Sequence, residues 1–128
     1  MRLRQRGRLR LVPASTIRHK DRAPTFTTRR ARFFNRVLGW EYHATPYEGA
    51  WRNFFGIRNY VWMKQEHEGL SRAGFAAVVA QFELKALMYD EKPFKRLQWL
   101  VRYARDGRRG RFVNMDPGEW VARARREA

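Results

Sequence analysis

The stretch SRAGFAAVVAQFELKALMY, residues 71–89, decides the fold. Its large apolar residues recur at steps of three and four, which is the period of an α-helix with a buried face. Ser71 is a residue type that favours the N-cap position, so it marks where the helix begins. The sequence therefore predicts a long central helix over residues 71–89. The residues expected to face the core are Phe75, Val78, Val79, Phe82, Ala86 and Tyr89.

On the N-terminal side, three further helices are predicted. The first covers residues 29–38, between a possible N-cap at Thr28 and a stop at Gly39, and its apolar stripe is Phe33, Phe34, Val37 and Leu38. The letters TPYE at residues 45–48 form a capping box, which predicts a helix over 46–55 that ends at Gly56. Another helix is expected over 57–68, ended by Gly69.

On the C-terminal side, Asp90 is a candidate cap for a helix over residues 91–105, with Gly107 after it. The letters DPGE at residues 116–119 are a second capping signature and predict a last helix that carries Trp120. Together these patterns predict an all-α fold: a small helical domain of about five to six helices over residues 28–128. The phenylalanines 33, 75, 82 and 94 and Trp120 are assigned to its core.

The charge is distributed unevenly along the chain. The 128 residues hold 28 Lys and Arg against 12 Asp and Glu, a net charge of +16. Residues 1–40 contain eleven Arg and one Lys against a single acid, Asp21, and so carry +11 of that total. A surplus of this size indicates a negatively charged partner: nucleic acid, an anionic membrane surface or an acidic protein.

The N-terminal segment, residues 1–27, is predicted to be an extended basic arm. Its first five arginines occupy every second position, from Arg2 to Arg10, and a period of two places them on one face of an extended chain. The absence of acids from the first twenty residues is also typical of a mitochondrial presequence, but presequences form amphipathic helices, and the alternation fits that poorly. A disordered basic tail is the other alternative.

Arginine outnumbers lysine by 23 to 5. Its planar guanidinium pairs bidentately with phosphate, which a lysine ammonium does not do; codon usage rich in G and C is an alternative source of the bias. The residues predicted to bind RNA, or another anion, are Arg2, Arg4, Arg6, Arg8, Arg10, Arg18, Lys20, Arg22, Arg29, Arg30, Arg32, Arg36, Arg108, Arg109, Arg111, Arg123, Arg125 and Arg126.

Five aromatic residues do not follow the predicted apolar stripes and are assigned to protein interfaces: Trp40, Tyr42, Tyr47, Tyr60 and Trp62. No motif for reading a base sequence is present, so RNA binding is expected to follow backbone and shape. Catalysis is not expected, because no nucleophile elbow, P-loop or histidine pair for a metal is found. We likewise expect no cofactor, metal or small-molecule substrate.

Two functions from different classes fit these features. The first is a structural subunit of a ribonucleoprotein, most concretely a mitochondrial ribosomal protein, whose arm binds rRNA phosphates and whose aromatic body contacts neighbouring subunits. The alternative is a non-catalytic accessory subunit of a mitochondrial membrane complex, such as a respiratory complex or ATP synthase, that contacts anionic lipid or acidic subunits. The expected location is the mitochondrial matrix or the matrix side of the inner membrane, and otherwise the cytoplasm.

Overall fold

The computed structural model describes residues 26–127, and over that part the chain forms helices and no strand. The all-α prediction is confirmed there. The predicted arm lies outside the described residues, except for its last two positions, so the division of the chain after residue 27 stays a prediction. The elements are α1 (Arg29–Leu38), the 3₁₀ turn η2 (Tyr47–Gly49), α2 (Trp51–Glu68), α3 (Arg72–Tyr89), α4 (Pro93–Arg108) and α5 (Pro117–Arg126).

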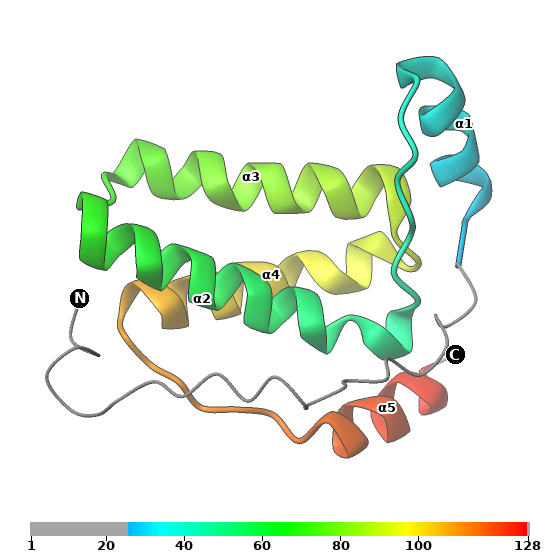
Figure 1. Cartoon of the computed structure of the whole chain (residues 1–128). Coiled ribbons are helices and arrows are strands. Elements are labelled where there is room, and N and C mark those ends of the chain that lie inside the picture. The colour runs from blue at the N-terminus through cyan, green and yellow to red at the C-terminus, as the bar shows by residue number, and fades with distance from the viewer. Residues whose placement is uncertain (1–25, 128) are drawn as a thin grey trace, which may run out of the picture.

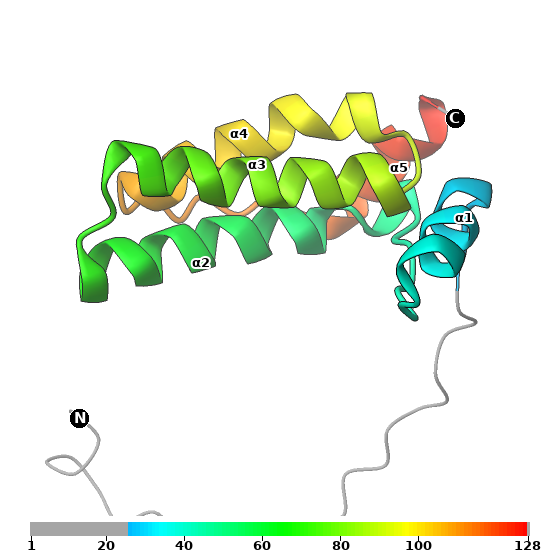
Figure 2. The same ribbon diagram turned by 90° about the horizontal axis from the view of Figure 1, so that it is seen from above.

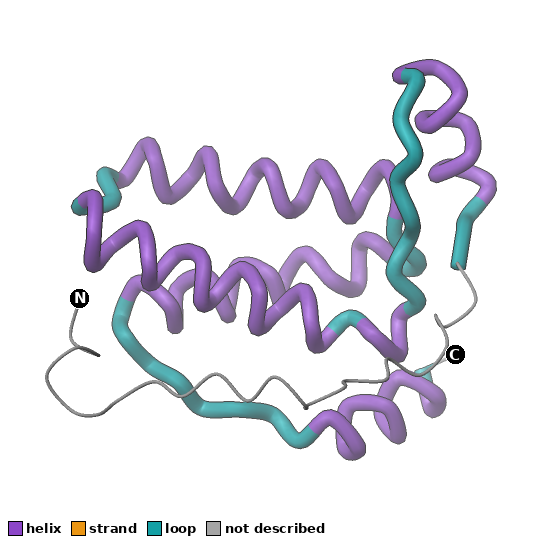
Figure 3. The backbone as a smooth tube through the Cα atoms, in the orientation of Figure 1, coloured by secondary structure: helices purple, strands orange, loops and turns teal. Residues whose placement is uncertain are grey.

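Helices α2, α3 and α4 pack together and form the body of the molecule (Figures 1 and 2). Consecutive helices run antiparallel, so α2 and α4 point the same way and α3 points the opposite way. Helix α1 lies across the end of this group where α3 finishes and α4 starts, and it packs on α3. After α4, a loop runs back along the body to α5, which packs against η2 (Figure 3).

Several helix ends fall where the sequence predicts them. The side chains of Thr28, Ser71 and Asp116 accept hydrogen bonds from the backbone N–H groups of the first turns of α1, α3 and α5. Gly39 and Gly69 follow α1 and α2 in the left-handed conformation, which glycine adopts without steric cost. These caps confirm the expected bounds of α1 and α3 and the expected start of α5.

The prediction of two helices separated at Gly56 is wrong. The capping box does not form, because the side chain of Glu48 pairs with Arg125 and does not accept from the backbone N–H of Thr45. The backbone N–H groups of Thr45 and Tyr47 donate instead to the carboxylates of Asp90 and Glu91. The chain therefore makes the short turn η2 first, and α2 then runs from Trp51 through Gly56 to Glu68 as one helix.

The predicted bounds of α4 are also wrong. Asp90 does not cap this helix: its carboxylate is buried and pairs with the buried guanidinium of Arg96 at 3.3 Å. Helix α4 begins at Pro93 and continues through Gly107 to Arg108. The left-handed residue that follows is Gly110, with φ of 65°, and it reverses the chain where Gly107 was expected to.

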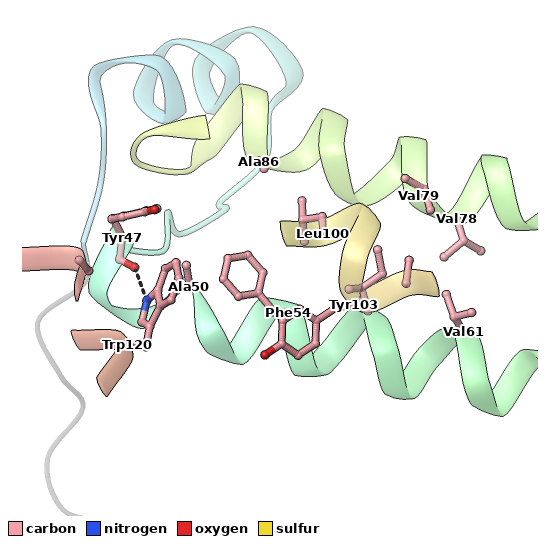
Figure 4. Close-up of a cluster of buried hydrophobic side chains, with 13 residues drawn as sticks. Tyr47, Ala50, Phe54, Val61, Val78, Val79, Ala86, Leu100, Tyr103 and Trp120 are labelled. Carbon is pink, nitrogen blue, oxygen red and sulfur yellow. Dashed lines mark hydrogen bonds between the residues drawn. The ribbon is translucent and has the colours of Figure 1, made fainter. Parts of the chain in front are cut away.

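The core lies between α2, α3, α4 and α5, with Trp120 of α5 fully buried at one end (Figure 4). The indole Nε1–H of Trp120 donates to the carbonyl oxygen of Tyr47 at 3.1 Å, so its polar atom is satisfied. Phe75 and Phe82 pack half-buried against this core. The core assignment is wrong for Phe33 and Phe94, whose side chains are 61% and 76% exposed. Val37 is 62% exposed, so most of the stripe predicted for α1 faces outward.

Candidate nucleic-acid interface

The C-terminal half of α4 and the loop after it line an open groove of about 650 Å³. Four arginines and one acid contribute its charged side chains, and the remaining wall is neutral. The lining residues are Gln98, Val101, Arg102, Arg105, Asp106, Arg109, Arg111 and Val113. A concave surface lined by cations concentrates anions from solution. This arginine groove is therefore the first candidate site for phosphate.

Helical periodicity places most of these arginines. Arg102, Arg105 and Arg109 follow one another at steps of three and four, so they project from one side of the helical segment. With a rise of 1.5 Å per residue, the first and the last are separated by roughly 10 Å along the helix axis. The turn at Gly110 then brings the chain back, and the N–H of Arg111 donates to the carbonyl oxygen of Asp106 at 2.8 Å.

A buried arginine holds the opposite wall of the groove. The guanidinium of Arg58 on α2 donates to the carbonyl oxygen of Val113 at 3.2 Å and to Oδ1 of Asn114 at 2.9 Å. The same guanidinium lies over the ring of Phe112, 5.1 Å from its centroid. Arg58 is only 5% exposed, so it serves the fold and is not available to a partner. Because the loop is fixed in this way, the groove exists before any ligand binds.

The charge of the arginine groove is mostly uncompensated. The ion pairs among residues 26–127 join Lys64 to Glu68, Arg96 to Asp90, Arg123 to Glu127 and Arg125 to Glu48. None of them includes an arginine of the groove, and Asp106 is the one acid in its lining. These guanidinium groups therefore keep donors for bidentate hydrogen bonds to phosphate.

The ring of Trp99 connects Arg102 of the arginine groove to Arg123 of α5. Arg102 lies over the indole of Trp99 at 5.3 Å, and Arg123 of α5 lies over the same indole at 5.0 Å. A cation over an aromatic face is attracted by the ring quadrupole, so Trp99 helps to position both guanidinium groups. Arg123 also pairs with Glu127, and the two contacts with Arg123 and Tyr47 lower the pKa of the Glu127 carboxyl.

The residues predicted to bind anions divide into several groups. Arg109 and Arg111 lie in the arginine groove, whereas Arg108 is half-buried and lies over the ring of Phe75 at 5.0 Å. Arg123 and Arg125 are in ion pairs, and Arg126 is exposed at the end of α5. The predicted residues that lie outside the described part of the chain are Arg2, Arg4, Arg6, Arg8, Arg10, Arg18, Lys20 and Arg22.

The arginines of α1 form a second basic surface at the other end of the molecule. Arg29, Arg32 and Arg36 line a shallow hollow of about 370 Å³ together with the exposed ring of Phe33. Arg30 is held differently, because its guanidinium donates to the carbonyl oxygen of Asp90 at 2.8 Å. Helix α1 and the C-terminal end of α4 lie at opposite ends of the body (Figures 1 and 2), so the two basic surfaces are separate.

Sequence reasoning missed Arg102 and Arg105, which form half of the cationic lining of the groove. Their spacing with Arg109 was a usable signal, since it is the spacing of one helix face. Gly107 hides this signal, because a glycine predicts the end of a helix and so separates Arg109 from the other two, whereas α4 continues to Arg108.

The aromatic residues assigned to protein interfaces also divide. Trp40 is 58% exposed, and Trp62, 37% exposed, contacts the ring of Phe112. Tyr42 and Tyr60 are half-buried beside Tyr89 and Phe82. The assignment is wrong for Tyr47, which is 3% exposed and packs in the core against Trp120.

The described residues hold no cluster of three or more His, Asp or Glu side chains that could bind a metal ion. Within the same part of the chain, no helix has the length and apolar character needed to cross a membrane. Comparison of the chain with protein-family models, with curated proteins and with solved structures finds no match in any of the three.

Proposed function

We propose that this protein is a structural subunit of a ribonucleoprotein, most concretely a mitochondrial ribosomal protein that binds rRNA phosphates. The observation that carries the proposal is the arginine groove at the end of α4, whose lining holds four arginines and one acid, Asp106. RNA presents phosphates at regular intervals, and each phosphate accepts the bidentate hydrogen bonds that arginine donates. The arm predicted over residues 1–27 would extend the same contact along the RNA.

Binding of this kind reads the shape and backbone of the RNA and not its bases. The four arginines share the lining of the groove with two valines, one glutamine and one aspartate. The nearby ring of Trp99 is not part of that lining, and the guanidinium groups of Arg102 and Arg123 lie over it. A stacking platform for bases is the usual requirement for recognising single strands. The groove therefore suits the phosphates of a folded RNA, with exposed aromatic residues such as Trp62 contacting neighbouring proteins.

Co-sedimentation of the tagged full chain tests this proposal. In mitochondrial extract, the protein should migrate with ribosomal particles through a density gradient and should leave those fractions after nuclease treatment. A variant with alanine at Arg2, Arg4, Arg6, Arg8 and Arg10 should associate less and keep the helical circular-dichroism signal of the parent. Migration with a detergent-solubilised membrane complex, unaffected by nuclease, would instead support the accessory-subunit alternative.

A further inference from the structure

Helix α1 presents an apolar edge that the protein does not cover. Phe33 and Val37 are one helical turn apart and are 61% and 62% exposed, and Trp40, which comes after the C-cap Gly39, is 58% exposed. Positions four residues apart lie on the same side of a helix, so Phe33 and Val37 form one continuous strip. We refer to Phe33, Val37 and Trp40 as the α1 edge. A contiguous exposed apolar strip bordered by charge marks an interaction site.

The exposure of the α1 edge is not the result of a loosely attached helix. The opposite side of α1 is docked on α3: Ala31 is fully buried, and the ring of Phe34 packs 6.3 Å from the ring of Tyr89. The hydroxyl of Thr28 donates to the carbonyl oxygen of Tyr89 at 2.9 Å. The amide of Asn35 bonds both the N–H and the carbonyl oxygen of Tyr42, which fixes the chain after the helix. The fold thus determines which side of α1 faces outward.

The charges beside the α1 edge are positive. Arg29, Arg32 and Arg36 border it on one side and form a hollow with Phe33, and helix α1 contains no acidic residue. Glu41 is the nearest acid along the chain and lies beyond the helix. An occupant of this surface must therefore combine negative charge with an apolar interior.

An anionic lipid bilayer has that combination. Arginine side chains lie at the level of the headgroups, while phenylalanine, valine and tryptophan enter the boundary with the acyl chains. RNA supplies the negative charge and could stack on Phe33, but it offers no partner for the aliphatic side chain of Val37. Helix α1 also lies at one end of the body (Figure 2), where a flat surface can approach it.

We propose that α1 is an in-plane anchor that holds this protein on an anionic membrane surface through the α1 edge and its three bordering arginines. This contact does not depend on the proposed function, because it uses the opposite end of the molecule from the arginine groove. A protein with both surfaces would place bound RNA next to a membrane.

Flotation with lipid vesicles tests the proposal on the full chain. The protein should float with vesicles of phosphatidylcholine and phosphatidylglycerol, and remain unbound with phosphatidylcholine alone. Phe33→Ser/Val37→Ser should lower the partition coefficient by roughly tenfold or more, because the two apolar side chains no longer enter the bilayer. The matched control is Met63→Ser/Leu84→Ser, which removes two apolar side chains, 46% and 58% exposed, from α2 and α3 and should float like the parent.

A second measurement separates insertion from simple charge attraction, since the basic residues of the N-terminal segment also attract anionic vesicles. Lipids brominated on their acyl chains should quench part of the tryptophan fluorescence, and that part should disappear in Trp40→Phe. Equal flotation of the α1 variant and the control would overturn the proposal, and so would quenching that does not depend on Trp40. Loss of RNA binding in the α1 variant with unchanged flotation would assign the edge to RNA instead. Failure of the co-sedimentation experiment alone would affect only the proposed function.

Discussion

Gly107 on α4 lies directly against the backbone of Arg58 on α2. A Cβ atom added to Gly107 would overlap the carbonyl oxygen of Arg58 and would lie 3.0 Å from its carbonyl carbon. The close approach explains why a glycine stands in the last turn of α4, where it weakens the helix. It also links the two walls of the arginine groove, because α4 carries Arg102 and Arg105 of the groove and Arg58 holds the loop opposite them.

Replacing Gly107 by alanine should therefore destabilise the protein by about 1–3 kcal/mol, since the backbone atoms that it meets have no freedom to move aside. Gly56→Ala is the matched control: it is also inside a helix, but no atom lies within 4 Å of the added Cβ. That variant should gain about 1 kcal/mol from the better helix propensity of alanine. Urea unfolding followed by tryptophan fluorescence measures both; a neutral or stabilising Gly107→Ala would refute the close packing of α2 on α4.

The buried pair of Asp90 and Arg96 ties the turn between α3 and α4 to the segment before η2. Besides the pair itself, Arg96 donates to the carbonyl oxygens of Glu91 at 2.7 Å and Thr45 at 2.6 Å. Burial lowers the pKa of Arg96, while the charges of Asp90 and Glu91 act in the opposite direction.

Arg96→Met should cost about 3–5 kcal/mol of stability, because it leaves the carboxylate of Asp90 buried without its cation. Adding Asp90→Asn should recover part of that loss, since the amide oxygen can still accept from the N–H of Thr45 and carries no charge. Urea unfolding curves of Arg96→Met and of the double variant Asp90→Asn/Arg96→Met measure the difference in their free energies of unfolding. If the double variant were less stable than Arg96→Met, the loss in the single variant could not be attributed to an unpaired buried charge.

Tyr47 should make stability fall at alkaline pH. Burial raises its pKa to about 12, and the hydrogen bond that its hydroxyl donates to Glu127 acts in the same direction. The folded protein thus holds this proton more tightly than the unfolded chain, whose tyrosines ionise near pH 10. The resulting stability is complete below pH 10 and is lost as the pH rises from about 10 to 12.

The loss expected from this group is on the order of 1–3 kcal/mol. Tyr47→Phe has no phenolic proton, so its free energy of unfolding should decline less over the same interval. Unfolding curves at several pH values between 9 and 12 measure the difference between the two proteins. Parallel declines in the parent and the variant would show that the Tyr47 hydroxyl is not protected by the fold.

Local signals in the sequence predicted those helix ends that depend on local contacts. The caps at Thr28, Ser71 and Asp116 act on N–H groups two or three residues away, so the sequence alone identifies them. The capping box at residues 45–48 failed because its backbone N–H groups at Thr45 and Tyr47 are bonded by Asp90 and Glu91, which lie 45 and 44 residues further along the chain. Gly56 and Gly107 look alike as stop signals, yet both lie inside helices, and only at Gly107 does the packing of α4 on α2 leave no room for a side chain.

The candidate site shows the same limit. Arg109 and Arg111 were predicted from their position in a basic loop, but Arg102 and Arg105 join them only once α4 is known to continue past Gly107. Exposure could not be predicted either. Phe33 and Phe94 have the spacing of core residues, yet α1 buries Ala31 and Phe34 on α3 and leaves Phe33 outside.

The salt dependence of RNA binding tests the central claim most directly. For the full chain, the logarithm of the affinity should fall linearly with the logarithm of the salt concentration, with a slope set by the number of phosphates contacted. In Arg102→Gln/Arg105→Gln/Arg109→Gln that slope should become shallower by roughly 2–3, at about 0.7–0.9 per lost contact. Arg52→Gln/Lys64→Gln/Arg72→Gln removes the same charge outside the groove and should keep the parental slope. Equal slopes in the two triple variants would contradict a phosphate-binding groove on α4.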